Sequence, residues 1–248
     1  MFEEERTSDT LFDGALRCLQ HRNGYRFSID PILLAHFVRL TKDEKILDLG
    51  AGCGVIGLIL LYRARKIIQS LTAFELQVGL AQLIRENISL NQFDEVMQVV
   101  EGDLRKLPHY FAPEYFSSVV CNPPFYPAGS GRVSRQKESE IARHQVACSL
   151  TEIISAAATA VENRGKVYLV YPAEGLGRLL ELLPKQQLIV KRVQLVYSYP
   201  DHLMAPQLLL LEAVKNGGEG VDIRPPFYIY DHKNGEYSEA MQQFYKAN

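Results

Sequence analysis

The stretch Lys45-Ile-Leu-Asp-Leu-Gly-Ala-Gly-Cys-Gly54 decides the fold. Its first half is an apolar run that predicts a buried strand. Its second half places Gly50, Gly52 and Gly54 in a tight turn, and residues 55–65 continue as a Leu- and Ile-rich helix. A glycine turn between a strand and a helix is typical of α/β proteins whose backbone closely approaches a ligand.

The spacing of these glycines favours one nucleoside cofactor over another. A dinucleotide site has the pattern Gly-x-Gly-x-x-Gly, whereas the third glycine here comes one residue too early. Asp48 stands two residues before Gly50, where a carboxylate would repel a pyrophosphate but suit the ammonium group of S-adenosylmethionine. We therefore expect Asp48 and the three glycines to bind S-adenosylmethionine. A ligand-free strand–helix turn is the alternative.

The rest of the chain alternates strands with helices. A capping box at Ser149-Leu-Thr-Glu152 opens one helix, which we expect to run to about residue 163 and to stop at Gly165. Further helices are expected at 77–90 and 175–183, and further strands at 71–75, 96–100, 116–121, 166–171, 188–199 and 207–214. This order predicts an α/β fold with a doubly wound, Rossmann-like sheet of seven strands. The sheet is mostly parallel, with an antiparallel strand at its C-terminal end.

Residues 1–44 precede the first core strand. Tyr25-Arg-Phe-Ser-Ile-Asp30 alternates and suggests a short hairpin arm, and Asp30-Pro31 resembles an N-cap followed by proline at the first helical position. We expect this N-terminal arm and helix to pack on the core. Residues 45–248 then form the main domain, in one compact unit overall.

The composition indicates a soluble cytoplasmic protein. The 248 residues are 47% hydrophobic with a net charge of −2, which excludes the global basic field of a nucleic-acid coat but not a local basic patch. There is no apolar run of membrane-span length and no signal-peptide pattern. The four cysteines are scattered, which predicts buried free thiols; with no cluster at metal-ligand spacing, we expect no metal.

Two further acids end successive strands. Glu75 comes 25 residues after Gly50, where a carboxylate can accept from both ribose hydroxyls of the cofactor. Asp103 follows the third strand, where it could accept from the adenine amino group. Either acid alone would more often be a solvated charge. Together with Asp48 they place three carboxylates at the edge where open α/β sheets bind ligands.

The run Cys121-Asn122-Pro123-Pro124-Phe125 closes the fourth strand at this edge. Two prolines cannot donate backbone hydrogen bonds and make the corner rigid. The Asn122 side-chain oxygen and the Pro123 carbonyl could each accept a hydrogen bond from a planar amine, and Phe125 could stack on a base. A simple strand stop is the alternative to this catalytic interpretation.

The corner resembles the Asn-Pro-Pro-Phe motif of class I S-adenosylmethionine-dependent amino-methyltransferases. With Glu140-Ile-Ala-Arg-His-Gln145 and Tyr237-Ser-Glu-Ala240, the chain looks like the bacterial tRNA adenine-N6 methyltransferase family. That family modifies the adenine beside the anticodon of valine tRNA. The resemblance implies an enzyme that transfers a methyl group to N6 of an adenine in tRNA. From the N-terminal arm, Tyr25, Arg26 and Ser28 could cover the cofactor; the alternative is that the aromatic side chains there only pack the arm.

The segment after the corner is basic. It implies RNA contacts beside the active site from Arg132, Arg135, Lys137, Arg143 and His144. A solvated loop is the alternative for the segment, and a helix cap is the alternative for His144.

Other functions remain open at this stage. The same chemistry would serve an N5-glutamine protein methyltransferase, a guanine-N2 RNA methyltransferase or a DNA adenine methyltransferase. A non-catalytic cofactor-binding module is the alternative from another class. We expect a tRNA partner, no membrane partner, and a monomer or weak dimer.

Overall fold

The central sheet grows outward from the strand that precedes the glycine turn. The computed structural model describes residues 6–22, 28–124, 148–201 and 203–247. Strand β3 (Glu44–Leu49) lies between β4 (Ile68–Glu75) and β6 (Phe116–Cys121) and is parallel to both. Strand β5 (Met97–Glu101) extends the sheet beyond β4, again in parallel. The carboxyl ends of these four strands therefore meet at one edge.

The other half of the sheet contains the antiparallel strand. Strand β7 (Val161–Pro172) is parallel to β6, and β9 (Leu208–Lys215) runs antiparallel between β7 and β8 (Leu188–Tyr197). The order β8-β9-β7-β6-β3-β4-β5 contains the seven predicted strands and confirms a mostly parallel sheet, but the whole sheet has nine strands. Two short strands that the sequence did not predict, β10 (Asp222–Ile223) and β11 (Phe227–Tyr228), add to β8.

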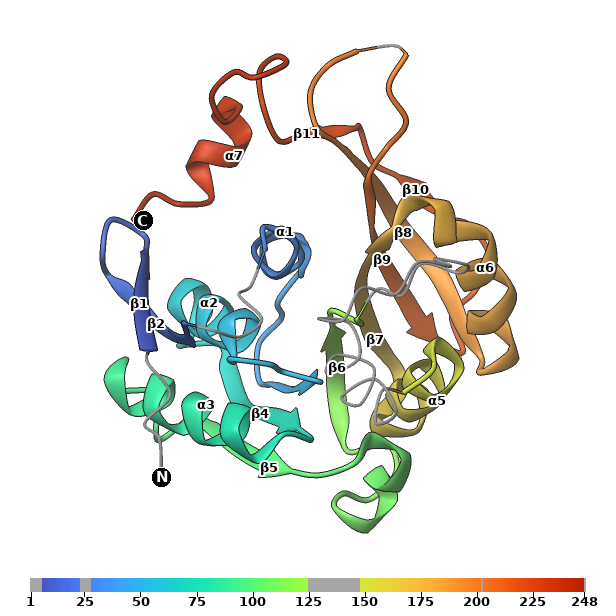
Figure 1. The fold of residues 1–248 in the computed structure, drawn as a ribbon. Coiled ribbons are helices and arrows are strands. Elements are labelled where there is room, and N and C mark those ends of the chain that lie inside the picture. Colours follow the sequence, from blue (N-terminus) through green and yellow to red (C-terminus); the bar gives the residue numbers. More distant parts are fainter. Residues whose placement is uncertain (1–5, 23–27, 125–147, 202, 248) are drawn as a thin grey trace, which may run out of the picture.

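One face of the sheet is covered by α1 (Asp30–Phe37), α2 (Val55–Ala64) and α3 (Val78–Leu90). Their apolar side chains share one buried cluster with Ile46 of β3. Figure 1 shows these helices inside the curve of the sheet. The prediction for α1 was wrong by one position, because Ile29 is the N-cap and Asp30 already belongs to the helix.

The opposite face carries α5 (Leu150–Ala160), α6 (Leu176–Lys185) and the short turns η1 (Leu104–His109) and η2 (Ala173–Gly175). The predicted capping box opens α5. The helix ends earlier than expected, because the β-branched Val161 pairs with Phe116 and begins β7. Gly165 is not the helix stop; an added Cβ there would lie 2.8 Å from the Ser117 carbonyl, so it serves the close approach of two strands.

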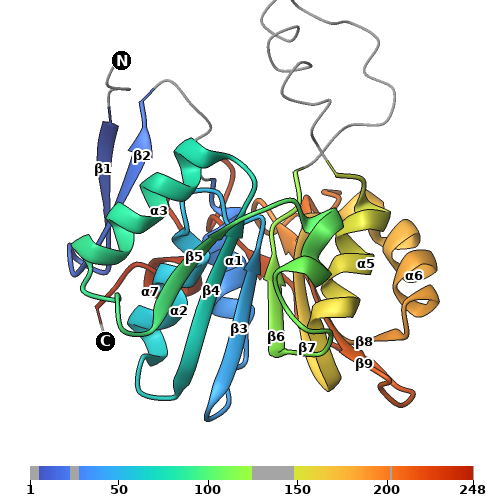
Figure 2. The same ribbon diagram turned by 90° about the horizontal axis from the view of Figure 1, so that it is seen from below.

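The first described residues form a hairpin that was not predicted. Strands β1 (Arg6–Leu11) and β2 (Leu16–His21) pair antiparallel, and the hairpin lies along α3 in Figures 1 and 2. It lies earlier in the chain than the hairpin expected at 25–30, of which residues 25–27 are outside the described part.

The C-terminal tail with α7 (Glu239–Gln243) passes over α1 toward the hairpin (Figure 1). Phe244 stacks on His36 of α1 with ring centroids 4.0 Å apart. The Ala247 N–H then donates to Asp13 in the hairpin turn at 3.1 Å. The C-terminal tail thus contacts both α1 and the N-terminal hairpin.

Within the described residues, no helix is long and apolar enough to cross a membrane. Nor does that part of the chain hold a group of three or more His, Cys, Asp or Glu side chains that could bind a metal ion. All four cysteines are free thiols. Cys18 and Cys121 are buried as expected, whereas Cys53 and Cys148 are only partly buried.

Candidate active site

The glycine turn is an open, left-handed bend at the carboxyl end of β3. Gly50, Gly52 and Gly54 have φ values of 77°, 61° and 82°, which side chains other than glycine rarely adopt. A Cβ added at Gly50 or Gly52 would meet no described atom within 4 Å. The turn is anchored because the N–H groups of Gly50 and Ala51 both donate to the Phe74 carbonyl. It therefore presents backbone to an open space, as a cofactor-binding turn requires.

Asp48 of β3 is completely buried and comes two residues before the first glycine of this turn. Its Oδ2 accepts from the Gly57 N–H in the first turn of α2 at 3.3 Å, and its Oδ1 has no partner among the described residues. Burial and the nearby Glu75 carboxylate raise the pKa of Asp48 to about 7. A buried carboxylate with a free oxygen fits a cationic ligand group such as the cofactor's ammonium.

Glu75, the last residue of β4, holds the glycine turn from the neighbouring strand. Its carboxylate accepts from the Gly52 N–H at 2.9 Å and from the Gln77 N–H at 2.9 Å. Burial raises the pKa of Glu75, and these backbone donors oppose that rise. Glu75, which we expect to accept from the ribose hydroxyls, thus also fixes the glycine turn, a role that sequence reasoning missed.

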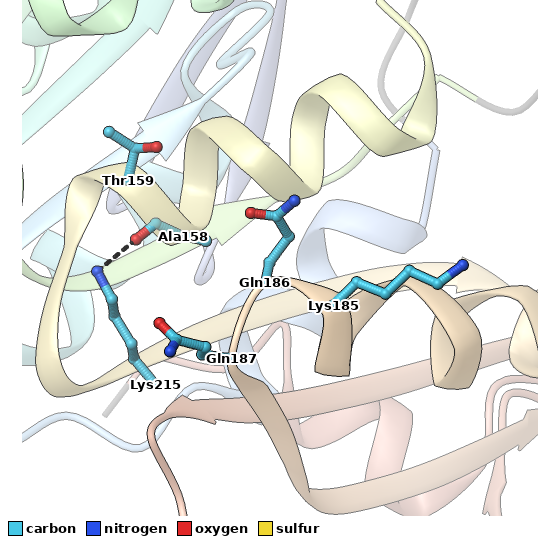
Figure 3. A pocket seen from close by; sticks show the side chains of 6 residues that line it. All are labelled: Ala158, Thr159, Lys185, Gln186, Gln187 and Lys215. Carbon is cyan, nitrogen blue, oxygen red and sulfur yellow. Dashed lines mark hydrogen bonds between the residues drawn. The ribbon is translucent and has the colours of Figure 1, made fainter.

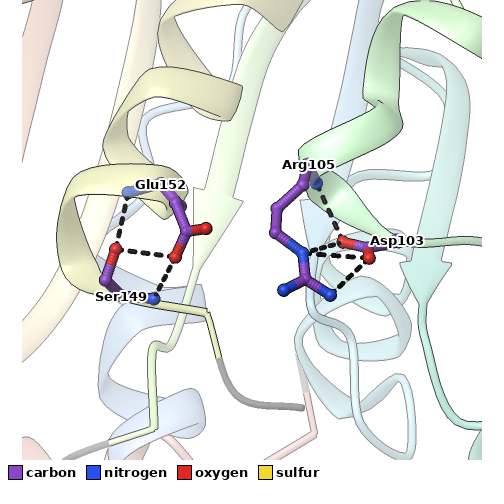
Figure 4. Close-up of polar contacts among 4 residues, drawn as sticks. All are labelled: Asp103, Arg105, Ser149 and Glu152. Carbon is purple, nitrogen blue, oxygen red and sulfur yellow. Dashed lines mark hydrogen bonds and ion pairs between the residues drawn. The ribbon is translucent and has the colours of Figure 1, made fainter. Parts of the chain in front are cut away.

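Asp103 follows β5 and is paired with Arg105, as Figure 4 shows. The Arg105 Nε lies 2.9 Å from each carboxylate oxygen, and Nη2 contacts Oδ2 at 2.5 Å. The Arg105 guanidinium holds the pKa of Asp103 below its usual value. Across from this pair, Ser149 and Glu152 form the capping box of α5 (Figure 4). Sequence reasoning missed Arg105, whose only signal is its place two residues after the acid.

The Asn-Pro-Pro corner lies at the same edge. Asp48 is in register with Val120 of β6, two residues before Asn122. The Asn122 Oδ1 is buried and has no partner among the described residues. Pro123 is buried and Pro124 is exposed. The structure therefore brings two unpartnered buried oxygens, from Asp48 and Asn122, to neighbouring strand ends.

The remaining predicted contacts divide between described and undescribed parts. Ser28 is exposed, and its Oγ accepts from the Asp30 N–H at 3.3 Å. Outside the described residues lie Tyr25, Arg26, Phe125, Arg132, Arg135, Lys137, Arg143 and His144.

Two concavities lie away from this site. One is bounded by Tyr230, Glu236, Tyr237 and Gln242 in the tail. The other, of about 320 Å³, lies between the C-terminal ends of α5 and α6 (Figure 3). There Lys215 donates to the Ala158 and Val161 carbonyls at 2.7 and 3.1 Å and pairs with Glu114 at 2.9 Å. Since all three ammonium protons have partners, Lys215 caps α5 and is not an anion site.

Comparisons with known proteins identify a family and relatives for this chain. The model of the methyltransferase small domain family matches residues 30–181, which include the glycine turn and the Asn-Pro-Pro-Phe corner. A Shewanella loihica protein named tRNA1(Val) (adenine(37)-N6)-methyltransferase is 29% identical over 232 residues. The match covers 90% of this chain and 93% of that protein.

Solved structures support the fold. A protein from Agrobacterium tumefaciens, described as a predicted O-methyltransferase, aligns with a TM-score of 0.69 at 20% identity and covers 88% of this chain and 98% of its own. The P. horikoshii TYW2 in complex with MeSAdo aligns with a TM-score of 0.58 at 16% identity, covering 88% of this chain and 74% of its own. At these identities the likeness concerns the fold alone.

Proposed function

The chain belongs to the methyltransferase small domain family, and we propose that it methylates the exocyclic N6 of an adenine in tRNA. Its methyl donor is S-adenosylmethionine, whose sulfonium supplies an activated methyl group when bound. The observation that carries the proposal is the unpartnered, buried Asn122 Oδ1 at the strand end beside Asp48. The name of the Shewanella loihica relative supports adenine 37 of a valine tRNA as the target.

The corner residues would act on the adenine amino group. An exocyclic amine is a poor nucleophile because its lone pair is delocalised into the ring. Hydrogen bonds accepted by Asn122 Oδ1 and the Pro123 carbonyl would direct that lone pair out of conjugation, and Phe125 would stack on the base. Positioning supplies much of the rate in such an arrangement. N6 would gain the methyl group as S-adenosylhomocysteine leaves, and the methylated, cationic nitrogen would then release its acidic proton to solvent, so no strong base from the protein is required.

The cofactor would be held by the three acids and the glycine turn. Asp48 would pair with the ammonium group, Glu75 with the ribose hydroxyls and Asp103 with the adenine amino group. Gly50, Gly52 and Gly54 would allow the backbone to approach. Tyr25, Arg26 and Ser28 would cover the site, while Arg132, Arg135, Lys137, Arg143 and His144 would contact the RNA.

The remaining parts of the proposal concern organisation. Residues 1–44 act as a support for the methyltransferase domain, with Leu16 and Cys18 of β2 in the same buried cluster as Leu58 of α2. The protein works in the cytoplasm, as a monomer or weak dimer.

The test uses unmodified valine tRNA transcripts with adenine or guanine at position 37 and methyl-labelled S-adenosylmethionine. We expect label only in the adenine transcript, recovered as N6-methyladenosine by nucleoside mass spectrometry. Label recovered as a methylated guanosine would contradict the proposal and indicate a guanine-N2 methyltransferase. Label found only in protein bands of a cell extract would contradict it and indicate a protein-glutamine methyltransferase.

A further inference from the structure

Two asparagines of the α3 region join this helix to the edge of the N-terminal hairpin. The Oδ1 of Asn91 accepts from the Arg17 N–H at 3.0 Å, and its Nδ2 donates to the Arg17 carbonyl at 2.7 Å. Asn87 repeats the pattern on Leu19, accepting at 2.7 Å and donating at 3.1 Å. Each side-chain amide therefore takes the place of a peptide group in a neighbouring β-strand.

The spacing of the two asparagines explains this match. Residues four apart on a helix are separated by about 6 Å along its axis. Alternate residues of a strand are separated by roughly 6.6 Å, so one helix face can pair with every second residue of β2. The outer edge of β2 is satisfied in this way, without another strand.

Only one of the two asparagines also reaches the glycine turn. The Asn87 Nδ2 donates to the Cys53 carbonyl at 3.0 Å and lies 3.8 Å from the Cys18 Sγ. The Cys18 Sγ in turn lies 3.8 Å from the Cys53 Sγ. Asn87 is completely buried. Among the described residues, the further side-chain contact of Asn91 is with the Asn87 carbonyl at 2.7 Å, not with the turn.

The same face of α3 leaves the turn no room to shift toward the helix. A Cβ added at Gly54 would lie 3.0 Å from Ile84, one helical turn before Asn87. On its other side the turn is held by the bond from the Gly52 N–H to Glu75 at 2.9 Å. Contacts from β4 and α3 thus fix the glycine turn from both sides.

We propose that Asn87 is a positioning residue for the cofactor, which couples docking of the N-terminal hairpin to the shape of the glycine turn. By donating to both Leu19 and Cys53, one amide group makes each contact depend on the other. The inference rests on the proposed role of the glycine turn in binding S-adenosylmethionine. It adds a hairpin contact as a second support for that turn.

The experiment compares matched substitutions in the full chain. Asn87→Asp keeps the oxygen that accepts from Leu19 but replaces the donor to the Cys53 carbonyl with a second oxygen. Asn91→Asp makes the same change opposite the Arg17 carbonyl without touching the turn. Calorimetric titration with S-adenosylhomocysteine should show Kd raised by about tenfold or more for Asn87→Asp and by less than about twofold for Asn91→Asp. The titration contains no RNA, so it tests the role of Asn87 even if the proposed RNA substrate is wrong.

Two further readouts separate coupling from loss of structure. Both variants should increase the alkylation rate of the buried Cys18, measured by peptide mass spectrometry, because both loosen the hairpin. At saturating S-adenosylmethionine, kcat of Asn87→Asp should stay within about twofold of wild type while KM for the cofactor rises. If Asn87→Asp does not fold, Asn87→Ala and Asn91→Ala give the same comparison without a charge. Unchanged cofactor binding in the Asn87 variants, or an equal loss in the Asn91 variants, would overturn the inference.

Discussion

Arg105 engages both carboxylate oxygens of Asp103 through its side-chain Nε and Nη2, and its backbone N–H is a third donor to the carboxylate, at 3.0 Å from Oδ1. All of these donors belong to a residue only two positions later, so the contacts that orient Asp103 lie within the loop after β5. The lowered pKa of Asp103 keeps this carboxylate ionised across the neutral range. An ionised, oriented acceptor is what recognition of an adenine amino group requires.

We predict that Asp103→Ala raises the Kd for S-adenosylhomocysteine by roughly 10- to 150-fold, because a hydrogen bond to a charged acceptor is worth roughly 1.5–3 kcal/mol. Arg105→Ala should have a smaller effect in the same direction, since it removes only the orientation of the acid. Calorimetry measures both. Glu181→Ala is the control, because it breaks another exposed ion pair, with Lys185, on α6. A larger loss for Arg105→Ala than for Asp103→Ala would contradict this order.

A second prediction concerns the pH dependence of cofactor binding. Asp48 binds a cation only when ionised, and its raised pKa of about 7 means that it is largely protonated at pH 6. Affinity for S-adenosylhomocysteine should therefore fall about tenfold for each pH unit below 7. Asp48→Asn should bind weakly at every pH and lose this slope. A slope that persists in Asp48→Asn would assign the titration to another group, of which Glu75 is the nearest candidate.

The raised pKa of Asp48 also predicts how the stability of the cofactor-free protein depends on pH. Its folded-state pKa lies above the unfolded value of about 3.9, so the folded state retains a proton that the unfolded state has lost. The contribution of Asp48 to stability is thus fully present below pH 4 and is lost as pH rises through 7. Asp48→Asn should raise Tm at pH 8 more than at pH 5 in thermal unfolding. An equal shift at both pH values would be inconsistent with a protonated Asp48.

The proposed catalytic role of Asn122 can be separated from a structural role in the corner. Asn122→Ala should lower kcat by about 100-fold while changing cofactor affinity little, because it removes an acceptor for the substrate amine. Ser118→Ala on β6, the strand that leads into Asn122, is the matched control, since its buried Oγ also lacks a partner among the described residues. Steady-state kinetics and calorimetry provide the two readouts. Comparable losses of kcat in both variants would point to damage of β6 and not to catalysis.

Lys215 tests the structural interpretation of the concavity in Figure 3. Lys215→Met leaves two helix-end carbonyls and Glu114 without their ammonium partner, which should lower the free energy of unfolding by about 1–3 kcal/mol. Urea denaturation measures this change. Methyl transfer at 20–25 °C, roughly room temperature, should be unaffected. Loss of activity in a folded Lys215→Met protein would instead indicate a ligand site there.

Much of the sheet could be predicted because its signals are local. The apolar runs and the glycine turn gave every long strand from β3 to β9 within a few residues. The hairpin was missed, although Asp13-Gly14 between two apolar-containing runs is a typical hairpin turn, and Asp13 has a φ of 53°. Strand β1 is polar except for Leu11, so its sequence shows little alternation of apolar and polar residues.

The candidate site was predicted unevenly for a similar reason. Residue type and strand-end position were enough to indicate Asp48, Glu75, Asp103 and Asn122. The contacts of Arg105 and Asn87 could not be predicted, because they depend on which side chains from separate segments meet. An asparagine on an otherwise amphipathic helix gives no sign that it will pair with a strand 68 residues earlier.

The bond between Ala247 and Asp13 has a consequence for how the protein is made. Asp13 emerges from the ribosome well before Ala247, which is synthesised more than 230 residues later. The stacking of Phe244 on His36 likewise waits for the tail. During translation the buried cluster on this face, to which Met241 belongs and against which Phe244 packs, therefore lacks these side chains. A nascent chain stalled before residue 244 would expose this apolar face to chaperones and to aggregation.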